Sequence, residues 1–127
     1  MVVPCQAGFV ELAKLGAGET AVAWTHIALG TGTGQGAAST TLATESAASG
    51  LARAAATVTT ETTTVTDDTI QLTHTFTAGA TATITEAGAF NAASGGDMLM
   101  VGDFTTSASV VSGDTLAVTL SCQIKSA

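Results

Sequence analysis

A strict alternation of apolar and polar residues is the feature that most constrains how this chain folds. Residues 69–77 read TIQLTHTFT, in which Ile70, Leu72, His74 and Phe76 alternate with threonine and glutamine. The same period of two runs through residues 115–125, TLAVTLSCQIK. This pattern predicts strands with one buried and one solvent-facing side. Threonine suits the solvent side because it is both β-branched and polar.

Turn-forming residues separate these strands from others. Asp67 and Asp68 precede the strand at 69–77, and Gly95 and Gly96 supply positive φ angles for a tight turn. We expect further strands in residues 22–30 and 51–61, and two more within residues 84–100, joined by the turn at 91–97. Many short strands between turns predict an all-β fold, a single-domain antiparallel β-sandwich or jelly roll with at most one short helix. The best helical candidate is Ser39–Ser49, which begins with capping hydroxyls and ends at Gly50.

The length of 127 residues predicts one domain with one core. Residues 1–21 are apolar without clean alternation and contain Pro4 and several glycines. We therefore interpret 1–21 as an N-terminal arm that packs on a neighbouring subunit, and 22–127 as the β-sandwich domain.

Composition indicates burial against other chains. Charged residues make up 10% of the chain, against about 25% in an average soluble domain, and aromatic residues make up 4%. We expect a homo-dimer or homo-trimer. The net charge of −7, with only three Lys and Arg, excludes a protein that coats nucleic acid. No apolar run is long enough to span a membrane and no secretory signal is recognisable, so we expect synthesis and assembly in the cytoplasm.

The motifs that usually carry chemistry are incomplete. The GTGTGQG stretch at residues 30–36 satisfies neither glycine fingerprint of nucleotide-binding loops and predicts a flexible loop. The histidines and cysteines do not stand at metal-site spacing, and no Gly-x-Ser-x-Gly elbow occurs. The sequence therefore predicts no catalytic, cofactor-binding or metal-binding residue. Cys5 and Cys122 are interpreted as reduced thiols, with a disulfide between them left open.

Three polar residues lie in otherwise apolar or small-residue strands: Arg53, His74 and Glu86. Glu86 is in step with Ile84 and Phe90, and a lone buried charge costs several kcal/mol unless it is paired. Strands near 70–77 and 80–90 are consecutive, so His74 and Glu86 could face each other across a hairpin, with Arg53 as the other available cation. A catalytic acid and base is the alternative. We interpret the three as structural polar anchors.

Four segments carry a resemblance to a known class of proteins: WTHIALGTGTG, ESAASGLARAAATVT, ITEAGAFNAASGGDMLMVGDF and SGDTLAVTLSCQIK. Over roughly residues 22–125 they resemble small all-β virion proteins of tailed bacteriophages. Some of these are head decoration or cement proteins, and others are tail-fibre or unassigned structural modules. The resemblance implies a β-sandwich that binds an assembled capsid or tail, and it carries over no catalytic residue.

These observations predict a non-enzymatic virion protein. Its expected role is to decorate or cement the capsid exterior by binding the major capsid protein, with a tail-fibre or adhesin module as the alternative. Each bound copy would stabilise the shell by mass action, without a chemical step.

Overall fold

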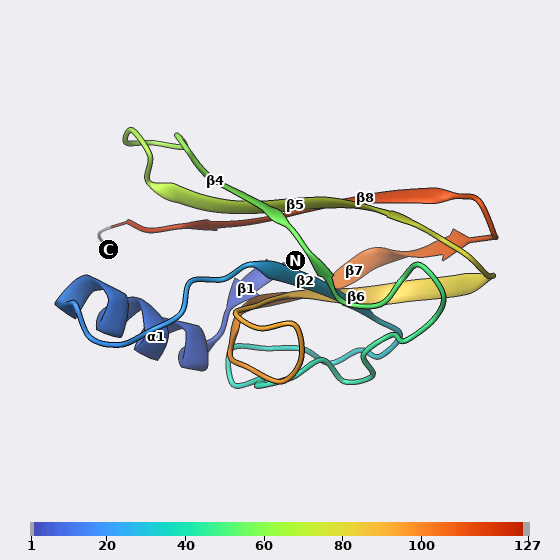
Figure 1. The fold of residues 1–127 in the computed structure, drawn as a ribbon, viewed down its shortest axis with the longest axis horizontal. Coiled ribbons are helices and arrows are strands. Elements are labelled where there is room, and N and C mark those ends of the chain that lie inside the picture. Colours follow the sequence, from blue (N-terminus) through green and yellow to red (C-terminus); the bar gives the residue numbers. More distant parts are fainter. Residues whose placement is uncertain (1, 126–127) are drawn as a thin grey trace.

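The computed structural model describes residues 2–125 of the chain. Two antiparallel sheets stack face to face, which confirms the predicted all-β sandwich (Figure 1). The larger sheet has the strand order β1-β7-β6-β2-β3, and the smaller has the order β4-β5-β8. The elements are β1 (Val2–Pro4), α1 (Gln6–Ala17), β2 (His26–Gly30), β3 (Ala54–Ala55), β4 (Thr57–Glu61), β5 (Thr69–Thr77), β6 (Ala82–Phe90), β7 (Met98–Val110) and β8 (Thr115–Gln123).

The chain crosses between the two sheets where the sequence suggested continuous strands or hairpins. Residues 51–61, predicted as one strand, form β3 in the larger sheet and β4 in the smaller one. Between them, the backbone N–H of Ala56 donates to the carbonyl oxygen of Thr25 at 2.8 Å. β5 pairs with β8, and β6 pairs with β7. The expected hairpin between β5 and β6 is therefore wrong, because these strands belong to opposite layers.

The space between the sheets holds the main apolar cluster, called here the inner core. Its large buried members come from both layers: Trp24, Ile27, Leu29, Leu51, Leu72, Phe76, Ile84, Leu99, Met100, Val118 and Leu120. In β8 the burial alternates along the strand, as the sequence pattern predicted. The smaller sheet is thus apolar on one face and open to solvent on the other.

A second apolar cluster, called here the outer core, covers the opposite face of the larger sheet. It contains Cys5, Ala28, Leu42, Phe90, Met98 and Val101. Leu42 belongs to the long connection between β2 and β3, which runs beneath the larger sheet in Figure 1. The larger sheet is therefore covered on both faces, and the last five residues of β6 are all buried.

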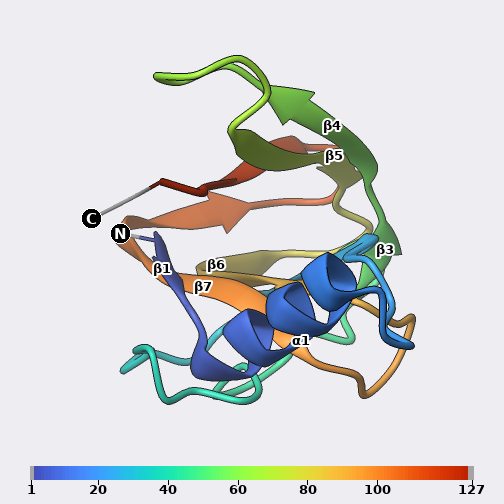
Figure 2. The same cartoon turned by 90° about the vertical axis from the view of Figure 1, so that its left-hand side faces the viewer.

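The helix occurs in a different place from the predicted one. Residues 39–49 form no helix but an irregular segment of the connection between β2 and β3. The helix α1 lies instead at Gln6–Ala17, at one end of the sandwich (Figures 1 and 2). It ends at Gly18, whose φ of 73° lets its N–H and that of Glu19 bond the last helical carbonyl groups.

The N-terminal segment packs on the chain's own sandwich. β1 pairs with residues 100–102 of β7, and the N–H of Cys5 donates to the carbonyl oxygen of Leu99 at 2.7 Å. A Cβ on Gly8 would lie 2.7 Å from the Cα of Leu99, so glycine allows α1 to approach β7 closely. The expectation that residues 1–21 pack away from the chain's own core is therefore wrong for this segment. The division into an arm and a domain at residue 21 stays a prediction.

Candidate functional site

Glu86 places a carboxylate inside the larger sheet. It is fully buried in β6, and its register neighbours are Gly30 in β2 and Asp103 in β7. Its Oε1 accepts hydrogen bonds from the backbone N–H of Ala43 at 2.7 Å and from Nε2 of Gln35 at 3.0 Å. Both donors come from the connection between β2 and β3. The carboxylate thus fixes this connection to the outer face of the larger sheet.

The glycines of the GTGTGQG stretch make room for this carboxylate. A Cβ on Gly30 would lie 2.6 Å from Cγ of Glu86, and one on Gly32 would collide with its Oε2. Thr85 adds a further tie by donating its hydroxyl to the carbonyl oxygen of Gly32 at 2.6 Å. The glycine spacing therefore serves the packing of a buried acid.

A second carboxylate binds the same connection. Asp103 Oδ2 accepts hydrogen bonds from the backbone N–H groups of Gly34 at 3.0 Å and Gln35 at 3.1 Å. Backbone N–H groups in such a glycine-rich loop could otherwise hold a phosphate. Here two of them, those of Gly34 and Gln35, point at the chain's own Asp103 carboxylate, which would repel an anion. The arrangement gives the loop a structural use and leaves no anion cradle at these N–H groups.

Arg53 connects a different pair of loops. It forms a two-pronged ion pair with Glu45, with Nε at 3.0 Å from Oε2 and Nη2 at 2.7 Å from Oε1. Its Nη1 donates to the carbonyl oxygens of Ala92 at 3.0 Å and Gly95 at 2.8 Å, in the turn between β6 and β7. The guanidinium carbon also lies 3.7 Å from the centre of the Phe90 ring. One arginine thus ties the β2–β3 connection, the β6–β7 turn and the outer core together.

His74 belongs to the other sheet. It is half-buried in β5, and its ring packs nearly perpendicular to that of Phe76, with the ring centres 4.6 Å apart and the planes at 81°. The structure therefore does not bring Arg53, His74 and Glu86 together. Glu86 bonds Ala43 and Gln35, Arg53 bonds Glu45, and the two cations considered as partners of Glu86 are not bonded to it. Their common role as structural anchors stays a proposal.

Gln35, Glu45 and Asp103 complete these networks and were not among the residues predicted from the sequence. The sequence did carry a signal for Asp103. Like Glu86, it is a carboxylate within a stretch of otherwise apolar or small residues. The partners in the loop carried no such signal, since their positions depend on how the connection folds back over the sheet.

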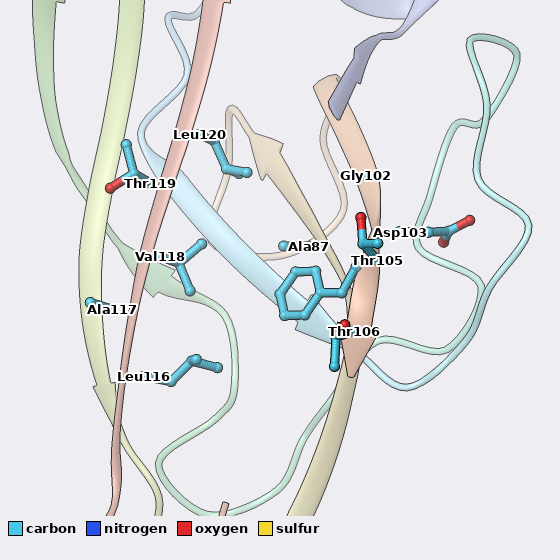
Figure 3. A pocket seen from close by; sticks show the side chains of 11 residues that line it. Ala87, Gly102, Asp103, Thr105, Thr106, Leu116, Ala117, Val118, Thr119 and Leu120 are labelled. Atoms are coloured by element: carbon cyan, nitrogen blue, oxygen red, sulfur yellow. The ribbon is translucent and has the colours of Figure 1, made fainter. Parts of the chain in front are cut away.

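One edge of the sandwich is open. β8 is the outer strand of the smaller sheet, and β1 pairs with β7 only at residues 100–102, so the next part of β7 has no strand beyond it in the described chain. A cavity of about 390 Å³ lies between these two strands. Figure 3 shows Leu116, Val118 and Leu120 of β8 directed across it towards β7. The apolar lining makes this edge a candidate surface for protein contact.

Other kinds of site find less support in the described residues. No group of three or more His, Cys, Asp or Glu within residues 2–125 could hold a metal ion. In the same range, no helix is long and apolar enough to cross a membrane. Cys5 and Cys122 are both free, and burial raises the pKa of each thiol, which keeps them protonated near neutral pH.

Comparison with known proteins identifies the family. Residues 11–124 match the model of a family described as podophage GP4 fiber I protein gp80. The chain belongs to this family. It is therefore a phage virion structural protein, and the resemblance to small all-β virion proteins is confirmed. Comparisons with curated proteins and with solved structures gave no significant match.

Proposed function

We propose that this chain is a structural subunit of a phage fibre and that it acts by binding other virion proteins. The observation that carries this proposal is the family match, which covers α1 from Glu11 onward and all the strands from β2 to β8. The fibre role was the alternative reading of the sequence. The family match favours it over capsid decoration, which was the leading one.

The geometry of the polar residues supports a role without a chemical step. Glu86 and Asp103 accept backbone N–H groups of the chain's own loop, and Arg53 is held by Glu45 and two carbonyl groups. A catalytic carboxylate or base needs a reacting atom within hydrogen-bond reach. In this structure Oε1 of Glu86, Oδ2 of Asp103 and the guanidinium of Arg53 bond groups of the fold itself, and His74 stands in the opposite layer.

The surface supports binding to other proteins. Phe9, Val10 and Leu15 of α1 are exposed, and the solvent-facing side of the smaller sheet is rich in uncharged threonine. A surface with few charges loses little hydration free energy when another protein covers it. Contacts repeated in every copy would add up along an assembled fibre.

A localisation experiment on virions distinguishes the two readings. Cryo-electron microscopy of purified particles, with this chain traced in the map, should place it in a fibre attached near the tail. Density over the capsid lattice in contact with the major capsid protein would instead establish decoration and overturn the fibre proposal.

A functional comparison gives an independent test. Virions that lack this chain should keep their DNA under heat or osmotic shock at the rate of complete virions, while their adsorption to host cells falls. Loss of DNA with normal adsorption is the result expected of a missing cement protein, and it would contradict the fibre proposal.

A further inference from the structure

We propose that the free edge of β8 pairs with β8 of a second copy of this chain, in an antiparallel register centred on Thr119. The pairing joins two smaller sheets into one continuous sheet. It concerns how copies of the chain associate and holds for either position in the virion.

The first support comes from comparing the strands at the sheet edges. Within residues 2–125, β1, β3, β4 and β8 are the outer strands. β1 has three residues and ends at Pro4, β3 has two residues, and β4 has five residues and ends at Glu61. Short length, proline and charge are devices that keep an edge from pairing with other chains. β8 has nine residues with neither a charge nor a proline, so it lacks all three.

The second support is the chemistry of the edge itself. In an antiparallel strand, about half of the residues direct N–H and C=O groups away from the neighbouring strand. β5 pairs with β8 along its whole length, from Thr115 to Gln123, so the outward groups of β8 form an uninterrupted row. An extended strand is the occupant that satisfies such a row. The apolar cavity beside β8 would then be covered as the second sandwich approaches.

The third support identifies a second copy as that strand. Each chain carries a net charge of −7, so two copies repel wherever their acidic residues meet, whereas β8 itself has no acidic residue to bring against a second β8. In the proposed register, Leu116 lies opposite Cys122 and Val118 opposite Leu120, which are apolar pairs on the inner face. On the outer face, Thr119 meets Thr119. Matched pairs of this kind stabilise antiparallel sheets.

The residues just beyond β8 add complementary charges at both ends. In this register Asp114 of one copy lies opposite Ile124 of the second copy, one residue from its Lys125. The twofold symmetry repeats this approach at the other end of the paired strands.

The test compares Thr119→Lys with a matched control, Thr59→Lys. Both threonines are exposed and lie in outer strands of the same sheet. In Thr119→Lys, two lysines stand opposite each other at the symmetry axis, and dimerisation should weaken by about fivefold, equivalent to ~1 kcal/mol. Thr59→Lys should dimerise like the wild-type chain. Sedimentation equilibrium of the full chain measures both constants, and circular dichroism checks that both variants are folded.

Mixing two variants makes the test specific for the register. Thr119→Glu alone should be weakened like Thr119→Lys, and a mixture of the two should form a heterodimer that is more stable than either homodimer. A wild-type chain that stays monomeric or forms trimers would overturn the proposal. So would a dimer that Thr119→Lys leaves unchanged, or a mixture that fails to form the heterodimer.

A measurement on the wild-type chain needs no variant. Amide hydrogen exchange in β8 should slow when the protein concentration is raised above the dissociation constant, while exchange in β4 stays unchanged. Slowing in β4, or unchanged exchange in β8, would contradict the proposed pairing.

Discussion

The two sheets of this molecule differ in how many of their faces are covered. The smaller sheet packs one face on the inner core and exposes threonines on the other, so β8 alternates between buried and exposed residues. The larger sheet lies between the inner and outer cores, and four consecutive residues of β2 are buried. A period of two in the sequence is therefore a sign of a one-sided sheet. The strands of a sheet covered on both sides are buried continuously, so their sequences do not show this alternation.

The comparison also explains the position of Glu86. The sequence placed Glu86 on one face with Ile84 and Phe90, but the register of β6 with β7 shifts between Ile84 and Glu86. Ile84 consequently belongs to the inner core and Phe90 to the outer core. Glu86 shares the outer side, where the loop supplies hydrogen-bond donors. A carboxylate can be buried in this sheet because its second face is covered by backbone that carries free N–H groups.

The largest expected effect tests whether the outer core stabilises the fold as much as the inner core. Phe90→Ala, in the outer core, and Phe76→Ala, in the inner core, should each lower the free energy of unfolding by ~3–5 kcal/mol, since both rings are buried. Urea denaturation measures both. A loss below ~1 kcal/mol for Phe90→Ala alone would mean that the β2–β3 connection does not pack tightly on the outer face of the larger sheet.

The next effect concerns the attachment of that cover. Glu86→Ala leaves the N–H of Ala43 and the amide of Gln35 without their acceptor and should lower the free energy of unfolding by ~1–3 kcal/mol. Glu86→Gln keeps the shape and an acceptor oxygen, so it should lose less. If Glu86→Ala proves neutral in a urea melt, Glu86 has no anchoring role.

The approach of α1 to the larger sheet gives a prediction with a control on the same helix. A Cβ at position 8 would collide with the backbone of Leu99, so Gly8→Ala should destabilise the fold by ~1–3 kcal/mol. Nothing lies within 4 Å of a Cβ at position 16. Gly16→Ala should therefore stabilise the helix by up to ~1 kcal/mol. Equal effects from both substitutions, measured by thermal or urea unfolding, would show that α1 does not pack closely on β7.

A smaller effect is expected at the exposed turn of the smaller sheet. Asp68 accepts hydrogen bonds from the backbone N–H of Val65, from Gln123 and from the N–H of Thr63, and these bonds hold its pKa well below the ordinary value of 3.8. A lowered pKa stabilises the fold above pH 4, and this contribution is lost as the pH falls towards the pKa of the folded state. Asp68→Asn should therefore be less stable than wild type at pH 7, with the difference shrinking at pH 2. A difference that grows on acidification would contradict this reading.

The same contrast shows what could be predicted from the sequence. The alternation in β5 and β8, the turns at Asp67–Asp68 and Gly95–Gly96, and the sandwich itself followed from local patterns and were confirmed. The helix was missed because its segment has helix-forming residues without a clear apolar stripe, interrupted by Gly8 and Gly16. Ser39–Ser49 was misread as a helix because capping residues also serve irregular loops, and here tertiary contacts decide the conformation.

The candidate site was less predictable than the fold. A buried charge in the strand of Glu86 was recognisable, but its hydrogen-bond partners come from a loop far away in the sequence. Arg53 and Glu45 are eight residues apart in a segment without regular structure, so no periodicity marks their ion pair. Such contacts form only when the β2–β3 connection folds over the outer face of the larger sheet. Local sequence patterns do not predict how it does so.

One paired substitution tests most directly whether the larger sheet is covered on both faces and the smaller sheet on one. Thr75 lies on the solvent side of β5, and Ala28 lies fully buried on the outer side of β2. Thr75→Lys should change the free energy of unfolding by no more than ~0.5 kcal/mol. Ala28→Lys should lower it by several kcal/mol or prevent folding, because it buries an unpaired charge. Urea melts in which both variants match the wild-type chain would contradict the two-sided burial of the larger sheet.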